Sequence, residues 1–213
     1  MAGDRGPTRP RLNARRLVGL DRSGPLPQQT RAGAPLRPFT LPNLVGYLRL
    51  ASIPVFLYIA LSSDDGRVAS ATVLYLWITL GDYVDGFLAR ATGQYSRMGA
   101  LLDPVVDRMS ALAGVIVCWH FDFLPHWSLA LLAIRELVTL MLARASLRRG
   151  IDLEISWVGR VATLFTFGGL FWSLVIDSWI TVAIFLIGVA LGLVATTLYV
   201  RATRRHLAEM AGK

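Results

Sequence analysis

Six apolar stretches, each long enough to cross a lipid bilayer as a helix, occupy most of the chain after residue 40. The hydrocarbon core of a bilayer is about 30 Å thick and needs roughly 20 apolar residues per helix. Only 17% of the 213 residues are charged, whereas an average soluble domain has about 25%. We therefore expect an all-α integral membrane protein with six transmembrane helices. The expected spans cover about residues 41–62, 67–90, 98–120, 126–147, 157–176 and 179–201.

Positive charge is concentrated on one side of these spans. Residues 1–38 contain eight arginines and two acidic residues, and further arginines follow the second, fourth and sixth spans. The other three connections are poor in positive charge. The positive-inside rule then places both termini, and the ends of the spans on that side, in the cytoplasm. We expect a multi-pass protein of the cell membrane.

The N-terminal segment differs in composition from the rest. Residues 1–39 are rich in Arg, Pro and Gly and contain no apolar run that could span a membrane. We expect a basic cytoplasmic arm that is partly disordered or amphipathic, and that faces anionic lipid headgroups rather than nucleic acid. Residues 40–205 would form the transmembrane domain, and residues 206–213 a cytoplasmic tail.

Four aspartates lie near the cytoplasmic ends of the second and third spans. Asp82 and Asp85 are three residues apart and Asp103 and Asp107 are four apart, so each pair lies on one face of its helix. An unpaired carboxylate at a span centre costs about 2.5–3.5 kcal/mol, and simple solvation at the interface is the alternative without a function. The short connection 92–97 makes the two spans antiparallel neighbours, so we expect the four carboxylates to converge in one pocket.

Carboxylates this close cannot all stay ionised without cations. Hard oxygen ligands suit Mg²⁺, Mn²⁺ or Ca²⁺, and no Cys or His accompanies the cluster to favour zinc. Two cations about 3.5–4 Å apart would hold a phosphoryl group from both sides. Gly86, Ala89 and Gly99 are small enough to let a ligand approach the backbone, and the guanidinium of Arg90 can pair with a phosphate.

Read together, these residues resemble the signature of the CDP-alcohol phosphatidyltransferase family. The family pattern D-x2-D-G-x2-A-R-x8-G-x3-D-x3-D is matched at all eight fixed positions between Asp82 and Asp107. The resemblance extends to Asn43 and Arg49 in the first span, where Gly46 stands in place of a frequent Thr.

The resemblance implies a six-helix membrane enzyme, usually a homodimer, with its site facing the cytoplasm. Such enzymes transfer a phosphatidyl group from a CDP-linked donor, here CDP-diacylglycerol, to a hydroxyl acceptor and release CMP. They use divalent metal, Mg²⁺ or Mn²⁺, with two ions expected. By position, Asp82, Asp85 and Asp103 would be metal ligands, and Asp107 would be the general base and a further ligand. The residues expected to bind the donor are Asn43, Asp82, Gly86, Ala89, Arg90 and Gly99.

Several arginines are candidate ligands for a phosphate of the acceptor. Arg135 lies near the middle of the fourth span, where a buried arginine requires a partner. That partner would be Glu136, a residue of another helix, or the acceptor. The other candidates lie nearer the inner surface, where the positive-inside rule alone would also place them. The full set is Arg108, Arg135, Arg144 and Arg160.

Glycerol 3-phosphate is the first choice of acceptor, which would give phosphatidylglycerophosphate. Phosphatidylglycerol, which would give cardiolipin, and an inositol phosphate are the alternatives within the family. A transporter without catalytic activity is the alternative of a different class. A transporter would be expected to carry acidic residues in more spans and along a path across the bilayer, whereas here the four aspartates gather at one end of two spans.

Overall fold

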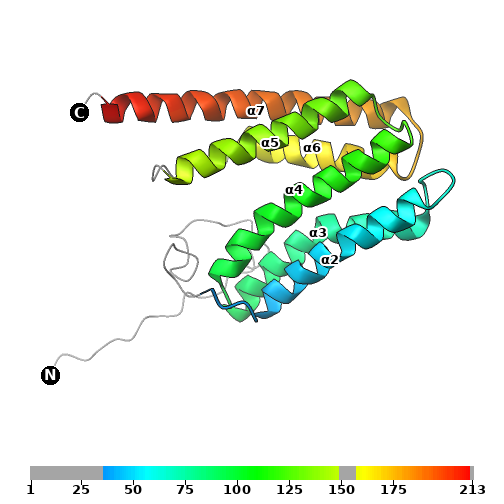
Figure 1. The fold of residues 1–213 in the computed structure, drawn as a ribbon, viewed down its shortest axis with the longest axis horizontal. Coiled ribbons are helices and arrows are strands. Elements are labelled where there is room, and N and C mark those ends of the chain that lie inside the picture. The colour runs from blue at the N-terminus through cyan, green and yellow to red at the C-terminus, as the bar shows by residue number, and fades with distance from the viewer. Residues whose placement is uncertain (1–35, 149–156, 212–213) are drawn as a thin grey trace. The chain divides into compact units, whose positions relative to one another are not determined.

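The computed structural model describes residues 36–148 and 157–211, which form helices joined by short connections (Figure 1). Within these residues there are six helices and no strand, so the all-α prediction is confirmed there. The predicted spans agree with the helices to within a few residues, except that the last helix continues to Ala211. The helices are α2 (Leu41–Leu61), α3 (Ala69–Thr92), α4 (Arg97–His120), α5 (His126–Arg148), α6 (Trp157–Ser173) and α7 (Trp179–Ala211).

Two of the described helices are long and apolar enough to cross a membrane, judged by length and composition. They are α2 and the segment Trp179–Arg201 of α7. Among the others, α3, α4 and α5 also carry charged residues, and α6 is 17 residues long. Most of the predicted N-terminal arm, residues 1–35, lies outside the described residues.

The helix ends around the aspartates follow from local sequence. Thr40 precedes α2, and its hydroxyl oxygen accepts a hydrogen bond from the backbone N–H of Asn43 at 3.4 Å. Gly93 follows α3 with a φ of 67°, in the left-handed region that glycine adopts at helix C-termini. Ser96 precedes α4, and its Oγ accepts a hydrogen bond from the N–H of Gly99 at 3.0 Å, as expected of an N-cap. Residues 93–96 are therefore enough to end one helix and begin the next.

Contacts divide the described residues into two compact units. The first, which we call the motif unit, contains residues 36–49 and 80–106. It comprises the beginnings of α2 and α4 and the end of α3. The second, the bundle unit, contains residues 50–79, 107–148 and 157–211. All of the predicted metal and donor residues except Asp107 belong to the motif unit.

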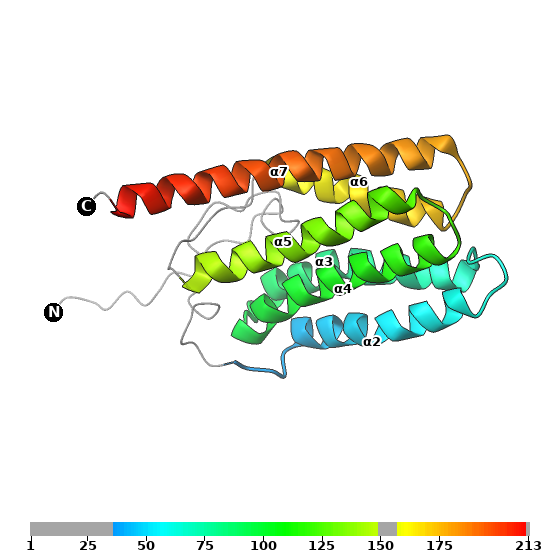
Figure 2. The same ribbon diagram turned by 45° about the horizontal axis from the view of Figure 1, so that its top comes forward.

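The bundle unit has an apolar core to which α6 and α7 contribute as adjacent helices (Figure 2). Glycines permit this close packing. A Cβ at Gly169 of α6 would lie 2.6 Å from the Cβ of Phe185, and a Cβ at Gly188 of α7 would lie 2.5 Å from the backbone nitrogen of Thr166. Gly169 of α6 and Gly188 of α7 therefore let the two helices approach closely. The largest fully buried apolar side chains of this core include Phe56, Tyr75, Ile78, Leu129, Leu132, Leu170, Leu174 and Phe185.

One arginine joins several connections of the bundle unit. The Nε of Arg67 donates to the carbonyl oxygen of Ser173 at 3.3 Å, and its guanidinium carbon lies 4.1 Å from the ring centroid of Phe123. Its Nη2 lies 3.9 Å from Asp177. These contacts link the start of α3 to the connections α4–α5 and α6–α7.

Two adjacent glycines of α6 provide a matched test of this packing. Replacement of a helical glycine by alanine gains about 1 kcal/mol of helix propensity, and a Cβ at Gly168 would meet nothing within 4 Å. At Gly169 the added methyl would collide with Phe185, and such overpacking costs about 1–3 kcal/mol. We predict that Gly168→Ala keeps or raises the melting temperature of the detergent-solubilised protein, whereas Gly169→Ala lowers it. Equal melting temperatures for the two variants would contradict the packing described here.

Candidate functional site

Three of the four predicted aspartates converge within the motif unit. Asp82 and Asp85 come from α3 and Asp103 from α4, and one carboxylate oxygen of each lies within 4.8 Å of the others. Asp85 is buried, Asp103 is half-buried and Asp82 is exposed. Oxygens grouped in this way could hold a hard divalent cation. The expectation that the spacing and the short connection bring these side chains together is met for these three.

Asp107, the fourth predicted aspartate, is half-buried on α4 and belongs to the bundle unit. Its backbone carbonyl oxygen accepts a hydrogen bond from the Oγ of Ser110 at 2.9 Å. Its assignment as general base and further metal ligand remains a prediction.

A buried arginine lies beside the carboxylates. The side chain of Arg49 on α2 is completely buried, and its Nη1 donates to the Oδ2 of Asp85 at 2.8 Å and lies 3.8 Å from the Oδ1 of Asp82. Gly81 leaves the space that this side chain occupies, because a Cβ there would overlap the Cδ of Arg49. The signature alone did not predict this contact. The sequence feature that could have indicated this contact is the position of Arg49 inside an apolar span, where an arginine requires an acidic partner.

A pocket of about 180 Å³ opens beside Asp85 and Asp103. Among its lining residues are five of the six predicted to bind the donor, the exception being Asp82. Carboxylates, a guanidinium and small residues thus border one space, which suits an anionic ligand that arrives with a cation. The lining residues are Pro42, Asn43, Asp85, Gly86, Ala89, Arg90, Gln94, Tyr95, Ser96, Gly99, Ala100 and Asp103.

The rim of this pocket is held by a short hydrogen-bond network. Ser96 Oγ, besides capping α4, donates to the Oδ1 of Asn43 at 2.8 Å. The Nδ2 of Asn43 donates to the carbonyl oxygens of Arg37 and Pro38, both at 3.0 Å. Gln94 Oε1 accepts a hydrogen bond from the backbone N–H of Leu41 at 3.1 Å. Asn43 thus lines the pocket while its amide joins the segment before α2 to the start of α4.

The two signature glycines differ in what their missing side chains allow. A Cβ at Gly99 would lie 2.9 Å from the Oδ1 of Asn43, so glycine permits α4 to begin close to that amide. A Cβ at Gly86 would lie 3.2 Å from the Nη1 of Arg90. The guanidinium of Arg90 therefore lies over the helix surface at Gly86, at the edge of the pocket. The side chain of Arg90 therefore occupies part of the space at Gly86 that was expected to admit a ligand.

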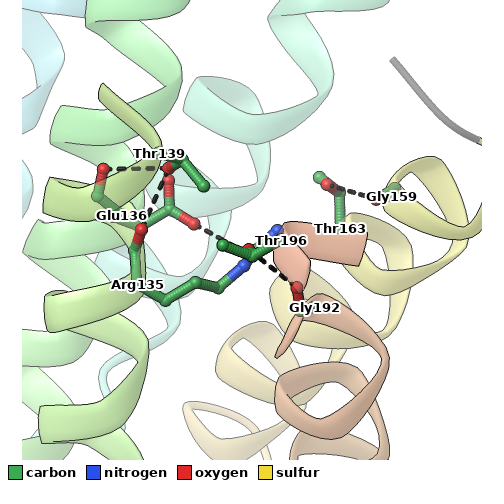
Figure 3. A network of polar contacts seen from close by, with 7 residues as sticks. All are labelled: Arg135, Glu136, Thr139, Gly159, Thr163, Gly192 and Thr196. Carbon is green, nitrogen blue, oxygen red and sulfur yellow. Dashed lines mark hydrogen bonds and ion pairs between the residues drawn. The ribbon is translucent and has the colours of Figure 1, made fainter. Parts of the chain in front are cut away.

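Of the partners expected for Arg135, the structure shows Glu136. The Nη1 of Arg135 donates to the Oε1 of Glu136 at 2.7 Å (Figure 3). The guanidinium lies against α7, since a Cβ at Gly192 would be 2.8 Å from its Nε. Thr196, one turn further on, donates from its hydroxyl to the carbonyl oxygen of Gly192 at 2.9 Å. Arg135 therefore has a structural partner, and its contact with an acceptor remains a prediction.

The other candidate acceptor residues lie on three helices. Arg108 is half-buried on α4 and Arg160 is exposed on α6. Arg144 belongs to α5, but its side chain lies outside the described residues. Contact of these arginines with an acceptor likewise remains a prediction.

Comparison with known proteins agrees with the signature. A profile of the CDP-alcohol phosphatidyltransferase family matches residues 39–194, a range that contains the motif unit from Phe39 onward. Among curated relatives, a protein of Shigella flexneri named CDP-diacylglycerol--glycerol-3-phosphate 3-phosphatidyltransferase is 29% identical over 182 residues, covering 80% of this chain and 98% of the relative. A protein of Streptomyces coelicolor named cardiolipin synthase (CMP-forming) is 34% identical over 140 residues, covering 64% of this chain and 65% of the relative.

Other relatives also match over part of their length. A protein of Bacillus subtilis with the same name as the Shigella relative is 28% identical over 137 residues, covering 59% of this chain and 71% of the relative. The chain spans about 60% of the length of the mycobacterial relatives that it matches at 34% identity.

The role of Ser96 in the pocket rim can be tested by deletion of its hydroxyl. Loss of an N-cap costs about 1 kcal/mol, and the buried Oδ1 of Asn43 would also lose the donor that it now has, at a cost of about 1–3 kcal/mol. We predict that Ser96→Ala lowers the free energy of unfolding by about 2–4 kcal/mol, measured by denaturant titration in detergent. Ser96→Thr keeps the hydroxyl and should lose less than half as much. Similar losses in both variants would show that the hydroxyl is not what stabilises the rim.

Proposed function

The chain belongs to the CDP-alcohol phosphatidyltransferase family, and we propose that it transfers a phosphatidyl group from CDP-diacylglycerol to a hydroxyl acceptor and releases CMP. The observation that carries the proposal is the cluster of Asp82, Asp85 and Asp103 at the border of a pocket that Arg90 and Gly99 also line. This arrangement combines carboxylates for cations with groups suited to a diphosphate.

Asp82, Asp85 and Asp103 would hold divalent cations, Mg²⁺ or Mn²⁺, of which two are expected. Bound there, the cations would supply positive charge that offsets the negative charge developing as the anhydride breaks. Arg90 is placed to pair with a phosphate oxygen. Gly86, Ala89 and Gly99 would leave room for the nucleotide, with Asn43 holding the rim.

Asp107 would accept the proton of the acceptor hydroxyl. The hydroxyl oxygen then forms a bond to the phosphorus that carries the diacylglycerol, the bond from that phosphorus to the anhydride oxygen breaks, and CMP leaves with the electron pair. The protein's contribution is mainly to position the two substrates and to stabilise charge in the transition state. The place of Asp107 in the signature supports this role.

Two acceptors have specific support. Glycerol 3-phosphate is favoured by the Shigella relative, which is aligned over 98% of its own length. Phosphatidylglycerol is favoured by the Streptomyces relative, which is more identical but aligned over 65% of its length. We propose glycerol 3-phosphate as the acceptor, with Arg108, Arg135, Arg144 and Arg160 as candidate ligands of its phosphate, and cardiolipin synthesis as the second candidate.

We also propose that the six helices span the cell membrane, with the signature and both termini in the cytoplasm. The two apolar helices and the phospholipid synthase names of bacterial relatives suggest a membrane protein. The distribution of arginines supports the orientation. Residues 40–205 would be the catalytic domain and residues 1–39 a basic arm at the lipid surface, and the enzyme would act as a homodimer, as its family resemblance implies.

The reaction can be tested with the purified protein in the presence of Mg²⁺, by measurement of the CMP that it releases from CDP-diacylglycerol. Parallel reactions would contain glycerol 3-phosphate, phosphatidylglycerol or no acceptor. We expect glycerol 3-phosphate to stimulate release and EDTA to abolish it. Stimulation by phosphatidylglycerol instead would identify a cardiolipin synthase, and failure of the protein to bind CDP-diacylglycerol would contradict the proposal as a whole.

Substitution of the proposed base gives a more local test. Asp107→Asn removes the proton acceptor while it keeps the size of the side chain. We predict a decrease in CMP release of about 10²- to 10⁴-fold, the usual contribution of a general base, with little change in melting temperature. The control is Asp177→Asn, which alters an exposed aspartate of the α6–α7 connection and should leave activity unchanged. If Asp107→Asn released CMP at the wild-type rate, Asp107 would not be the general base.

A further inference from the structure

Arg49 is the largest side chain that the described residues bury completely. An arginine cannot be deprotonated in a protein, so a positive charge lies permanently among the residues of the motif unit. Burial of a charge is costly unless a partner of opposite charge and hydrogen bonds compensate for it. The compensation here comes from Asp85 at 2.8 Å and Asp82 at 3.8 Å, which are two members of the carboxylate cluster.

The site is built around this guanidinium. Gly81 precedes Asp82 by one residue on α3, and a Cβ there would overlap Cδ and lie 2.8 Å from Nε of Arg49. Asp85 is only 6% exposed, so its carboxylate has limited access to water. The guanidinium of Arg49, 2.8 Å away, compensates the charge of Asp85.

The same charge must oppose the binding of a divalent cation. Arg49 cancels one of the three negative charges of Asp82, Asp85 and Asp103, and it occupies a lone pair of Asp85 that a cation could use. Like charges a few ångströms apart repel strongly at the effective dielectric constant of a protein. A diphosphate would restore the balance, because it brings negative charge of its own to the cations.

We propose that Arg49 is a positioning residue of the metal centre that lowers its affinity for divalent cations until a diphosphate is present. Arg49 keeps the carboxylates assembled without metal and makes tight loading depend on the donor. This inference rests on the proposed function, because it takes the carboxylates to be metal ligands and the pocket to receive a diphosphate.

The test is a titration of the full-length protein in detergent with Mn²⁺ alone, in which free Mn²⁺ is followed by electron paramagnetic resonance. Arg49→Gln keeps a donor for Asp85 but removes the charge, and we expect it to bind Mn²⁺ about tenfold more tightly than the wild type, which corresponds to about 1.4 kcal/mol. Arg49→Lys keeps the charge and should stay within about threefold of the wild-type Kd. Arg67→Gln, which removes a different arginine with an aspartate partner, should leave the Kd unchanged.

Wild-type or weaker Mn²⁺ binding by Arg49→Gln would overturn the proposal. If that variant does not fold, the test rests on Arg49→Lys, which keeps the charge. A change of about tenfold in its Mn²⁺ affinity would show that geometry rather than charge sets the affinity, and would overturn the proposal. CMP release by the wild type distinguishes a failure of the role of Arg49 from a failure of the proposed function. A wild type that releases CMP, together with an unaffected Arg49→Gln titration, would refute the role of Arg49 alone, whereas a wild type that neither binds Mn²⁺ nor releases CMP would refute the proposed function.

Discussion

The burial of one carboxylate beside an arginine is the constraint on which the motif unit depends. Asp85 is buried at the end of α3, with Asp82 and Asp103 close to it, and such a cluster repels itself unless positive charge is present. The structure supplies one charge through Arg49 and leaves a pocket in which a cation could supply more. Gly81 makes room for the side chain of Arg49, whereas the signature glycines Gly86 and Gly99 make room for Arg90 and for the amide of Asn43 at the pocket.

Helix termini turn this electrostatic requirement into a defined site. Gly93 ends α3 and Ser96 begins α4, so that Asp103 is brought back to the aspartates of α3 within a few residues. Ser96 also holds Asn43, which in turn holds the segment before α2. Three helix ends are therefore joined by hydrogen bonds at the rim of one pocket, and a ligand there would meet backbone and side chains fixed before it arrives.

The sequence predicted those features that depend on local pattern. Apolar runs located the helices, and spacings of three and four residues, with a short connection, predicted the meeting of Asp82, Asp85 and Asp103. The contact of Arg49 with Asp85 was not predicted, because it depends on how α2 is rotated about its axis and on the space left at Gly81. The amide of Asn43, expected at the donor, holds the protein's own backbone, which no spacing rule reveals. For Arg135 the sequence left several partners open, and only the side-chain conformation in the structure shows the pairing with Glu136.

The central claim is that the carboxylate cluster and the adjoining pocket form one site for a divalent cation and a diphosphate. Calorimetric titration of the purified protein with CDP, once with Mg²⁺ and once with EDTA, tests this claim most directly, since it requires neither the acceptor nor the lipid chains. The account predicts that CDP binds with Mg²⁺ and that EDTA or the substitution Asp103→Asn abolishes binding. Equal affinity for CDP in Mg²⁺ and in EDTA would contradict it, because the nucleotide would then be held without the cation that the carboxylates are proposed to bind.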